Sequence, residues 1–201
     1  HMKIPFVHIS TDHLFDGQKA LVSENEIIKP LNQYAKSKVR GENLVREFHS
    51  KAIIVRTNFF GWGTSFRQSF SDFIILNLRK QKTITLFKDV FFTPILIESL
   101  IINIYELIEK NLSGTFNIVS DDRLSKYDFG MKIAKKFDLN FELIQLGSIY
   151  DNKNLVSRPH DMSLSNKKLS LILNRSIGST EEYIEKLFEQ EKFKANAQIT
   201  K

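Results

Sequence analysis

The chain has 201 residues, of which 42% are hydrophobic and 26% are charged, and it contains no cysteine. Without cysteine, neither disulfide bonds nor thiol catalysis is available, and a reducing, cytoplasmic setting is expected. Twenty-nine basic and 23 acidic residues give a net charge of +6, but the lysines are spread out, so nucleic-acid binding is not expected. No apolar run is long enough to span a membrane, and the histidines lack metal-ligand spacing.

The first predicted element is a short buried strand over residues 5–10, rich in β-branched and aromatic side chains. Ser10, Thr11 and Asp12 follow, so that two hydroxyls and a carboxylate stand at the carboxyl end of a strand. Ligands bind at that end of the strands in open α/β sheets. Alternatively, Thr11 and Asp12 only cap the loop that follows.

A helix is predicted over about residues 33–48, after a loop over residues 18–31. Pro30 disfavours a helix immediately before it, and Asn32 is a favourable N-cap residue. Gly41 lowers the helix propensity, which suggests a close approach to the sheet or to a ligand.

Tyr34 and Lys38 lie four residues apart, so their side chains share one face of this helix. An ammonium beside a phenol favours the phenolate, and such a pair can serve as an acid/base device. A hydroxyl such as that of Thr11 could hold a carbonyl oxygen against the phenol. Tyr-x-x-x-Lys is nevertheless a loose pattern, which on an arbitrary helix usually describes a packed aromatic residue beside a solvated lysine.

A second buried strand is predicted over residues 52–57, a continuous apolar run that ends in polar residues. The order strand, helix, strand predicts a βαβ unit with a right-handed crossover and a parallel sheet. Residues 58–63 then combine aromatic side chains with glycine, which fits either a second site loop or a packed turn.

The rest of the chain predicts a further alternation of helices and strands. Helices are expected over residues 69–79, 94–108, 125–137, 166–173 and 180–188, and strands over residues 83–87, 114–119 and 141–146. Residues 147–160 are polar and loop-like, and the tail after Lys192 is expected to fray.

Several segments resemble the extended short-chain dehydrogenase/reductases, and among them the dTDP-4-dehydrorhamnose reductase branch. Residues 10–17 (Ser-Thr-Asp-His-Leu-Phe-Asp-Gly) and 30–38 (Pro-Leu-Asn-Gln-Tyr-Ala-Lys-Ser-Lys), followed by Gly41-Glu42, are similar to two motifs of that branch. The likeness continues in the same order at residues 55–57 (Val-Arg-Thr) and at Arg158-Pro159, so it covers nearly the whole chain.

The resemblance implies an α/β fold: the C-terminal part of an NAD(P)-binding Rossmann-like parallel sheet and a smaller α/β substrate-binding domain. Residues 3–63 would form the partial Rossmann-like strand–helix–strand unit. Residues 64–190 would form mainly the substrate-binding domain, with a return to the sheet expected near residues 80–120.

The resemblance also implies an NAD(P)H-dependent reductase of a nucleotide-activated 4-keto-6-deoxy sugar. Tyr34 would give a proton to the keto oxygen, Thr11 would hydrogen-bond the same oxygen, and Lys38 would bind the nicotinamide ribose. The residues expected to bind NADPH or NADH are Ser10, Tyr34, Lys38, Asn58 and Phe59. Those expected to bind the nucleotide-diphosphate sugar are Asp12, Phe59, Trp62 and Arg158, with Arg158 at the diphosphate.

The chain departs from the family pattern at its start. The family's glycine-rich phosphate loop lies far upstream of the catalytic tyrosine, and Tyr34 comes too early to allow one. We therefore expect a C-terminal portion that binds NAD(P)H poorly by itself. Strand 5–10 would then be a sheet edge that self-associates or pairs with a partner chain. His13 stands where the family usually has a tyrosine, and Phe59 stands where it often has a tryptophan. Trp62 could take the place of that tryptophan. The identity of the sugar therefore stays open.

Two alternatives to a reductase remain open. A non-catalytic regulatory subunit, similar to the β-subunit of methionine adenosyltransferase, would bind a partner through the exposed strand, although the retained Thr11, Tyr34 and Lys38 argue against it. A nucleotide-sugar epimerase or dehydratase would carry additional acid/base residues after Thr11. A dehydratase would have an Asp-Glu pair where this chain has Asp12-His13.

Overall fold

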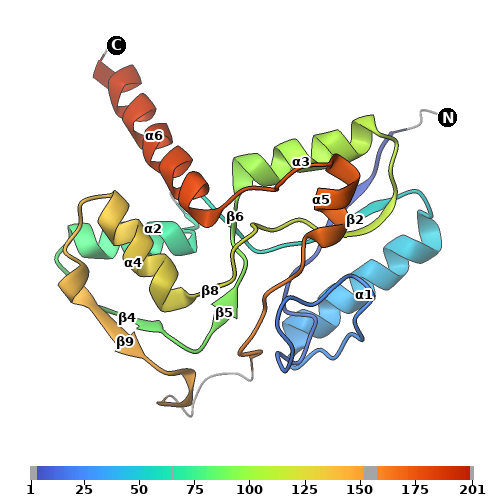
Figure 1. Cartoon of the computed structure of the whole chain (residues 1–201), viewed down its shortest axis with the longest axis horizontal. Coiled ribbons are helices and arrows are strands. Elements are labelled where there is room, and N and C mark those ends of the chain that lie inside the picture. The colour runs from blue at the N-terminus through green and yellow to red at the C-terminus, as the bar shows by residue number, and fades with distance from the viewer. Residues whose placement is uncertain (1–3, 65, 152–157, 200–201) are drawn as a thin grey trace.

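The computed structural model describes residues 4–64, 66–151 and 158–199, with side chains described up to residue 193. Within these residues the fold is α/β (Figure 1). The helices are α1 (Gln33–Phe48), α2 (Phe70–Arg79), α3 (Ile97–Glu109), α4 (Lys126–Lys136), α5 (Lys167–Leu173) and α6 (Thr180–Ile199), with 3-10 turns η1 (Phe141–Leu143) and η2 (Ile149–Asp151). The strands are β1 (Val7–Ile9), β2 (Ile53–Arg56), β3 (Phe59–Phe60), β4 (Ile84–Phe87), β5 (Phe91–Phe92), β6 (Ile95–Leu96), β7 (Gly114–Asn117), β8 (Leu124–Ser125) and β9 (Ile144–Gly147).

The main sheet has β2 at its centre, with β1 and β7 on either side and parallel to it. The register places His8 beside Ile54 and Ile54 beside Thr115. β1, α1 and β2 therefore form the parallel crossover unit that the sequence predicts. Outside this sheet, β3 pairs with β6 and β4 with β9 in parallel, and β5 pairs with β8 antiparallel.

β2 is buried along its whole length because helices cover both faces of the sheet. Ile53 and Val55 belong to the main core together with Leu100 of α3, whereas Ile54 packs with Val45 of α1. Successive side chains of a strand point to opposite faces, so α3 and α1 lie on opposite sides of the sheet (Figure 1).

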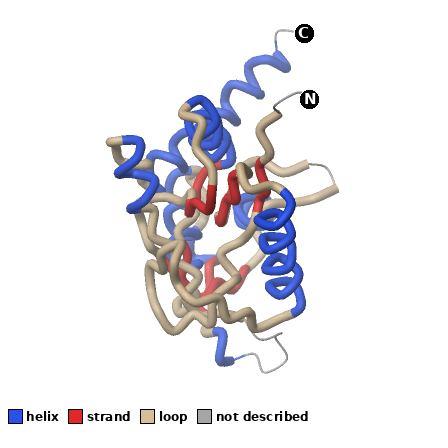
Figure 2. Tube along the Cα trace, turned by 90° about the vertical axis from the view of Figure 1, so that its right-hand side faces the viewer, coloured by secondary structure: helices blue, strands red, loops and turns tan. Residues whose placement is uncertain are grey.

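The main core continues under α2 and α4 as a group of phenylalanine rings. Phe129 of α4 lies 5.0 Å from Phe60, 5.7 Å from Phe70 and 5.4 Å from Phe92, measured between ring centroids. Figure 2 shows the strands grouped in the interior, with helices and loops around them. The aromatic rings therefore join the main sheet to the part of the fold that carries α2 and α4.

Two predicted boundaries in the middle of the chain are wrong. The helix predicted from Pro94 begins at Ile97, since the Ile95 N–H donates to the Asn58 carbonyl at 3.0 Å and β6 adds to β3. The strand predicted over residues 141–146 begins only at Ile144, and the turn η1 precedes it. Residues 152–157 of the predicted polar loop lie outside the described residues.

The last helix is longer than predicted. It was expected to end near residue 188, but α6 continues to Ile199. The Arg79 guanidinium donates to both carboxylate oxygens of Glu191 at 2.7 Å, and the Gln190 amide donates to Glu98 at 2.8 Å. Such tertiary contacts override helix propensity. Even at this length α6 is not apolar enough to cross a membrane, and nor is any other described helix.

Truncation of Phe129 tests the aromatic core. Phe129 is fully buried, so Phe129→Ala should lower the free energy of unfolding by about 3–5 kcal/mol through lost contacts and a residual cavity. Urea-induced unfolding measures the change. Phe66→Ala is the control, because the Phe66 side chain is 89% exposed. Equal losses in the two variants would contradict the assignment of the core.

Candidate active site

Tyr34 and Lys38 belong to the first turns of α1, which lie beside the end of β1. The helix begins as the sequence predicts, with the Asn32 side chain accepting the Ala35 N–H at 2.9 Å. Tyr34 is 52% exposed, and the Lys38 ammonium lies 5.9 Å from the centroid of its ring. The same ammonium donates to the Ile9 carbonyl at 3.2 Å. Lys38 therefore ties the tyrosine-bearing helix to the last residue of β1.

Thr11 and Asp12 are buried just beyond β1. The Thr11 hydroxyl donates to one carboxylate oxygen of Asp12 at 3.2 Å, and Asn58 donates to the other at 2.6 Å. Asn58 follows β2, so polar residues from the carboxyl ends of two neighbouring parallel strands come together. Ligand sites of open α/β sheets lie in this position.

His13 lies beside both groups. Its ring stands edge-on to the Tyr34 ring at a centroid distance of 5.8 Å, and its Nε2 is 3.8 Å from an Asp12 oxygen. Its Nδ1 is buried and has no hydrogen-bond partner in the described part of the chain. The sequence singles out His13 only as a departure from the family pattern, whereas the fold places it between the tyrosine and the acid.

A buried charge network lies beneath this site. The Glu42 carboxylate accepts two hydrogen bonds from Arg56, at 3.0 and 2.9 Å. It also accepts the Ser10 hydroxyl at 2.6 Å and the Arg46 guanidinium at 2.5 Å. Ser10 follows β1, Glu42 and Arg46 belong to α1, and Arg56 ends β2. One carboxylate therefore joins the three elements that carry the site.

The network keeps Glu42 ionised. Burial alone would raise the pKa of the Glu42 carboxyl. The hydrogen bonds and charge of Arg56, with the hydrogen bonds from Ser10 and Arg46, outweigh burial and lower the pKa. A buried carboxylate is tolerated only when charge and hydrogen bonds compensate it in this way.

The remaining predicted contact residues lie in different surroundings. Ser10 donates its hydroxyl to Glu42, on the α1 side of the sheet. Phe59 is 47% exposed beside Asn58. Trp62 is directed to another part of the fold, where its indole N–H donates to the Leu187 carbonyl at 3.1 Å. The structure therefore brings Phe59, but not Trp62, close to the strand ends.

Arg158 is exposed and adjoins the loop that follows β1. Gly17 adopts φ +79°, and a Cβ atom there would lie 2.7 Å from the His160 nitrogen and 2.9 Å from Pro159. Only glycine permits both the conformation and the approach. This contact brings Arg158, from late in the chain, next to the loop that begins with Thr11 and Asp12.

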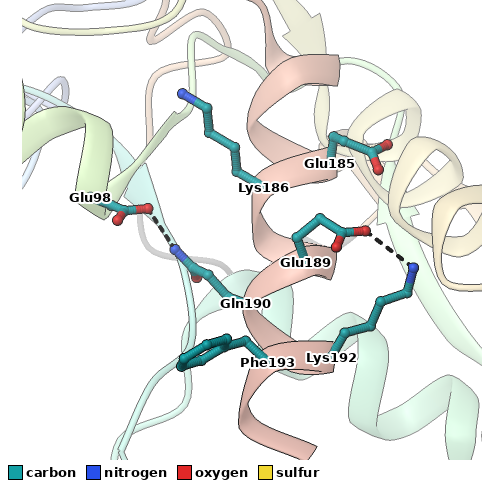
Figure 3. A pocket seen from close by; sticks show the side chains of 7 residues that line it. All are labelled: Glu98, Glu185, Lys186, Glu189, Gln190, Lys192 and Phe193. Carbon is teal, nitrogen blue, oxygen red and sulfur yellow. Dashed lines mark hydrogen bonds and ion pairs between the residues drawn. The ribbon is translucent and has the colours of Figure 1, made fainter. Parts of the chain in front are cut away.

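Two hollows of the described surface lie elsewhere. One of about 660 Å³ is lined by α6 and by Glu98 of α3 (Figure 3). Inside it, Gln190 donates to Glu98 and Lys192 donates to Glu189. The other, of about 800 Å³, is lined by α4 and α6 side chains with Phe141. None of the predicted site residues lines either hollow, so the expected chemistry belongs to the strand ends.

The sequence indicates Glu42 and Arg56 only as positions in family-like segments, and not as a buried charge network. Glu42 occupies the buried face of α1 with Ala35 and Val45, and Arg56 ends a buried strand. Charged residues at positions where the pattern expects apolar ones were the available signal.

Fold and site together define an α/β protein with a tyrosine–lysine pair at the carboxyl end of a parallel sheet. Over residues 1–193 the chain matches the family described as the RmlD substrate binding domain, and it belongs to that family. The resemblance drawn from the motifs is thereby confirmed.

Similar proteins include two reductases and a solved reductase structure. The dTDP-4-dehydrorhamnose reductase of Aggregatibacter actinomycetemcomitans is 33% identical over 178 residues, which cover 81% of this chain and 59% of the relative. The probable low-salt glycan biosynthesis reductase Agl14 of Haloferax volcanii is 32% identical over 161 residues, 78% of this chain and 54% of the relative.

A dTDP-4-dehydrorhamnose reductase from Bacillus anthracis, solved in complex with NADP, superposes with a TM-score of 0.85 at 26% identity. The alignment covers 92% of this chain and 66% of that structure. The predicted Rossmann-like α/β fold is therefore confirmed. The chain spans only a little more than half the length of the two related reductases.

Replacement of Glu42 tests the buried network. Glu42→Gln keeps the shape of the side chain but leaves Arg56 without its counter-ion. We expect the free energy of unfolding at neutral pH to fall by about 3–5 kcal/mol. The lowered pKa means that the contribution of Glu42 is present above the unfolded-state pKa and is lost as the pH falls through the folded-state pKa. The deficit of the variant should therefore shrink below about pH 4.5.

Urea-induced unfolding at several pH values measures this deficit. Glu47→Gln is the control, because Glu47 lies on the exposed face of the same helix. A deficit for Glu42→Gln that does not change with pH, or one no larger than that of Glu47→Gln, would contradict a charge-based role.

Proposed function

We propose that this chain is the substrate-side portion of an NAD(P)H-dependent reductase of a nucleotide-activated 4-keto-6-deoxy sugar. In this proposal the reductase belongs to the extended short-chain dehydrogenase/reductase type. The supporting observation is the meeting of Thr11, Tyr34 and Lys38 at the end of β1. The fold is shared with a dTDP-4-dehydrorhamnose reductase solved with NADP.

Each member of the set has a role that follows from its surroundings. The Tyr34 phenol gives its proton to the keto oxygen of the sugar. The Lys38 ammonium lies 5.9 Å from the ring centroid and binds the nicotinamide ribose in this proposal. Thr11 turns its hydroxyl hydrogen from Asp12 to the same keto oxygen, while Asn58 continues to hold Asp12. These groups position and polarise the carbonyl.

The open side of β1 fits a nicotinamide cofactor. Residues 6 and 10 bond to β2, so the Ile9 carbonyl, which holds Lys38, faces away from it. Lys38 and the half-exposed Tyr34 are therefore accessible from the side that β2 does not cover. Tyr34, Lys38 and Phe59 would hold NADPH or NADH, which supplies the hydride when bound. Asn58 and Ser10 would stabilise this cofactor site through their hydrogen bonds to Asp12 and Glu42.

The substrate would approach from the loop side of the same strand ends. Asp12 and Phe59 lie near the keto sugar, and Arg158 meets the diphosphate, where a guanidinium can bond two oxygens. Residues 4–63 with β7 form the cofactor-facing sheet portion in this proposal. The later part of the chain forms the substrate-binding domain.

The unpaired edge of β1 is the proposed joining point for the cofactor-binding portion or for a partner chain. Among the described residues β1 pairs only with β2, so the N–H and C=O groups on its other side have no strand beside them. An open strand edge is a template for pairing. A non-catalytic subunit that binds a partner through this edge is the second candidate function.

Replacement of Tyr34 separates these candidates. In the protein joined to a cofactor-binding segment, Tyr34→Phe should lower kcat for a dTDP-4-keto-6-deoxy sugar about 10²- to 10⁴-fold, because the proton donor is lost. The dissociation constant of the sugar nucleotide should change little. Oxidation of NADPH measures the rate, and Tyr105→Phe on the exposed face of α3 is the control. Equal rates in both variants would favour the binding subunit.

Proline at the edge of β1 tests the joining point. By alternation, the Val7 N–H faces the open side, whereas the His8 N–H faces β2. Val7→Pro should leave the melting temperature nearly unchanged and reduce self-association, measured by sedimentation velocity at rising concentration. His8→Pro removes a bond within the sheet and should lower the melting temperature. Unchanged association in Val7→Pro would exclude this edge as the contact.

A further inference from the structure

Lys126 has an unusual environment for a lysine. It is the first residue of α4, and its ammonium lies 3.3 Å from the ring centroid of Phe92 and 4.5 Å from that of Phe70. Its three N–H groups make no hydrogen bond or ion pair in the part of the chain that the structure describes. Aromatic faces attract the charge, and the side chain is only partly buried, so the N–H groups stay open to solvent or to a bound acceptor.

The position of Lys126 is also unfavourable for a cation. The N-terminus of a helix carries a positive partial charge. The reciprocal hydrogen bonds between Ser125 and Asp128 fix this end of α4, so the lysine cannot unwind from it without losing the cap. Burial lowers the pKa of the Lys126 amine to about 7, although the charge of Asp12 acts in the opposite direction. A cation at this position that has no carboxylate partner among the described residues is available to a bound anion.

Lys126 also lies within electrostatic reach of Asp12 in the candidate active site. Its charge interacts with Asp12, yet it forms no ion pair with that carboxylate, whose oxygens are held by Thr11 and Asn58. Its own backbone N–H donates to the Val90 carbonyl at 2.9 Å, next to β5.

The segment that carries Arg158 reaches the same strand from the other direction. The His160 carbonyl accepts the Phe91 N–H at 2.8 Å. Arg123 also lies over Phe91, but Asp161 neutralises it with hydrogen bonds of 2.9 and 2.6 Å. Lys126 and Arg158 are thus two basic residues near β5 that lack such a carboxylate partner among the described residues.

We propose that Lys126 is a specificity-determining residue whose ammonium binds the diphosphate of the nucleotide sugar beside β5. This inference rests on the proposed function and adds a residue to its site. The keto-deoxy sugar carries no charge, so the diphosphate is the anionic part of that ligand class. The bound anion accepts charge-assisted hydrogen bonds from the amine.

Calorimetric titration of the whole chain with dTDP and with inorganic pyrophosphate tests the assignment. Lys126→Met should weaken both ligands about 10- to 100-fold, the usual effect of losing a hydrogen bond to a charged group. Lys126→Arg keeps the charge and should retain most of the affinity. Lys132→Met is the matched control, because Lys132 lies on the same helix and pairs with Glu181 at its surface.

The pH dependence gives a readout that a packing role would not change. Asp12 is the charged group that acts on the amine, while α2 and β5 present only the rings of Phe70 and Phe92 to it. Wild-type affinity for pyrophosphate should fall relative to Lys126→Arg as the pH rises through about 7, because the amine loses its proton and the guanidinium does not.

The outcomes separate this inference from the proposed function. If the wild type binds dTDP and Lys126→Met binds it equally well, the role of Lys126 is overturned and the reductase proposal stands. Equal losses in the Met and Arg variants, or a loss for dTDP without one for pyrophosphate, also overturn it. If the wild type binds neither ligand, the substrate class fails and the inference fails with it. Lys126→Met should fold normally, since removing a buried charge is often neutral or stabilising.

Discussion

The buried carboxylate of Glu42 connects the three elements from which the candidate site is built. Its partners Ser10 and Arg56 stand just before polar residues of the candidate site: Ser10 is followed by Thr11, and Arg56 by Thr57 and Asn58. Glu42 itself lies one helical turn beyond Lys38. A buried ion pair is stable only when its hydrogen bonds are satisfied, so the geometry of this pair constrains the strand ends and the helix at the same time.

The site has two sides with different character. On the side of the open β1 edge, Tyr34 is half exposed and Lys38 donates to the Ile9 carbonyl. On the other side, the loop after β1, the segment at Pro159 and the strand β5 pack closely, and Gly17 permits the tightest of these contacts. The open side suits a large flat cofactor, and the packed side suits an anionic ligand held by basic residues.

The open edge of β1 can be compared with the length of the related reductases. The aligned segment covers 54% and 59% of the related reductases, and β2 is nevertheless packed on both faces. The chain therefore has a hydrophobic core of its own while leaving one edge of its sheet unpaired. A fold with these two properties can receive a further strand without rearranging its interior.

The sequence by itself determined the local structure near the site. Alternating short apolar runs, the Asn32 cap and the Pro30 boundary specified β1, α1 and β2, and the four-residue spacing placed Tyr34 and Lys38 on one face. Tertiary contacts alone set the pairing of Asn58 with Asp12, the approach of Pro159 to Gly17, the contact of Lys126 with Phe92 and the full length of α6. The physical reason is that periodicity and capping act between near neighbours in the chain, whereas burial and charge pairing depend on residues that folding brings together.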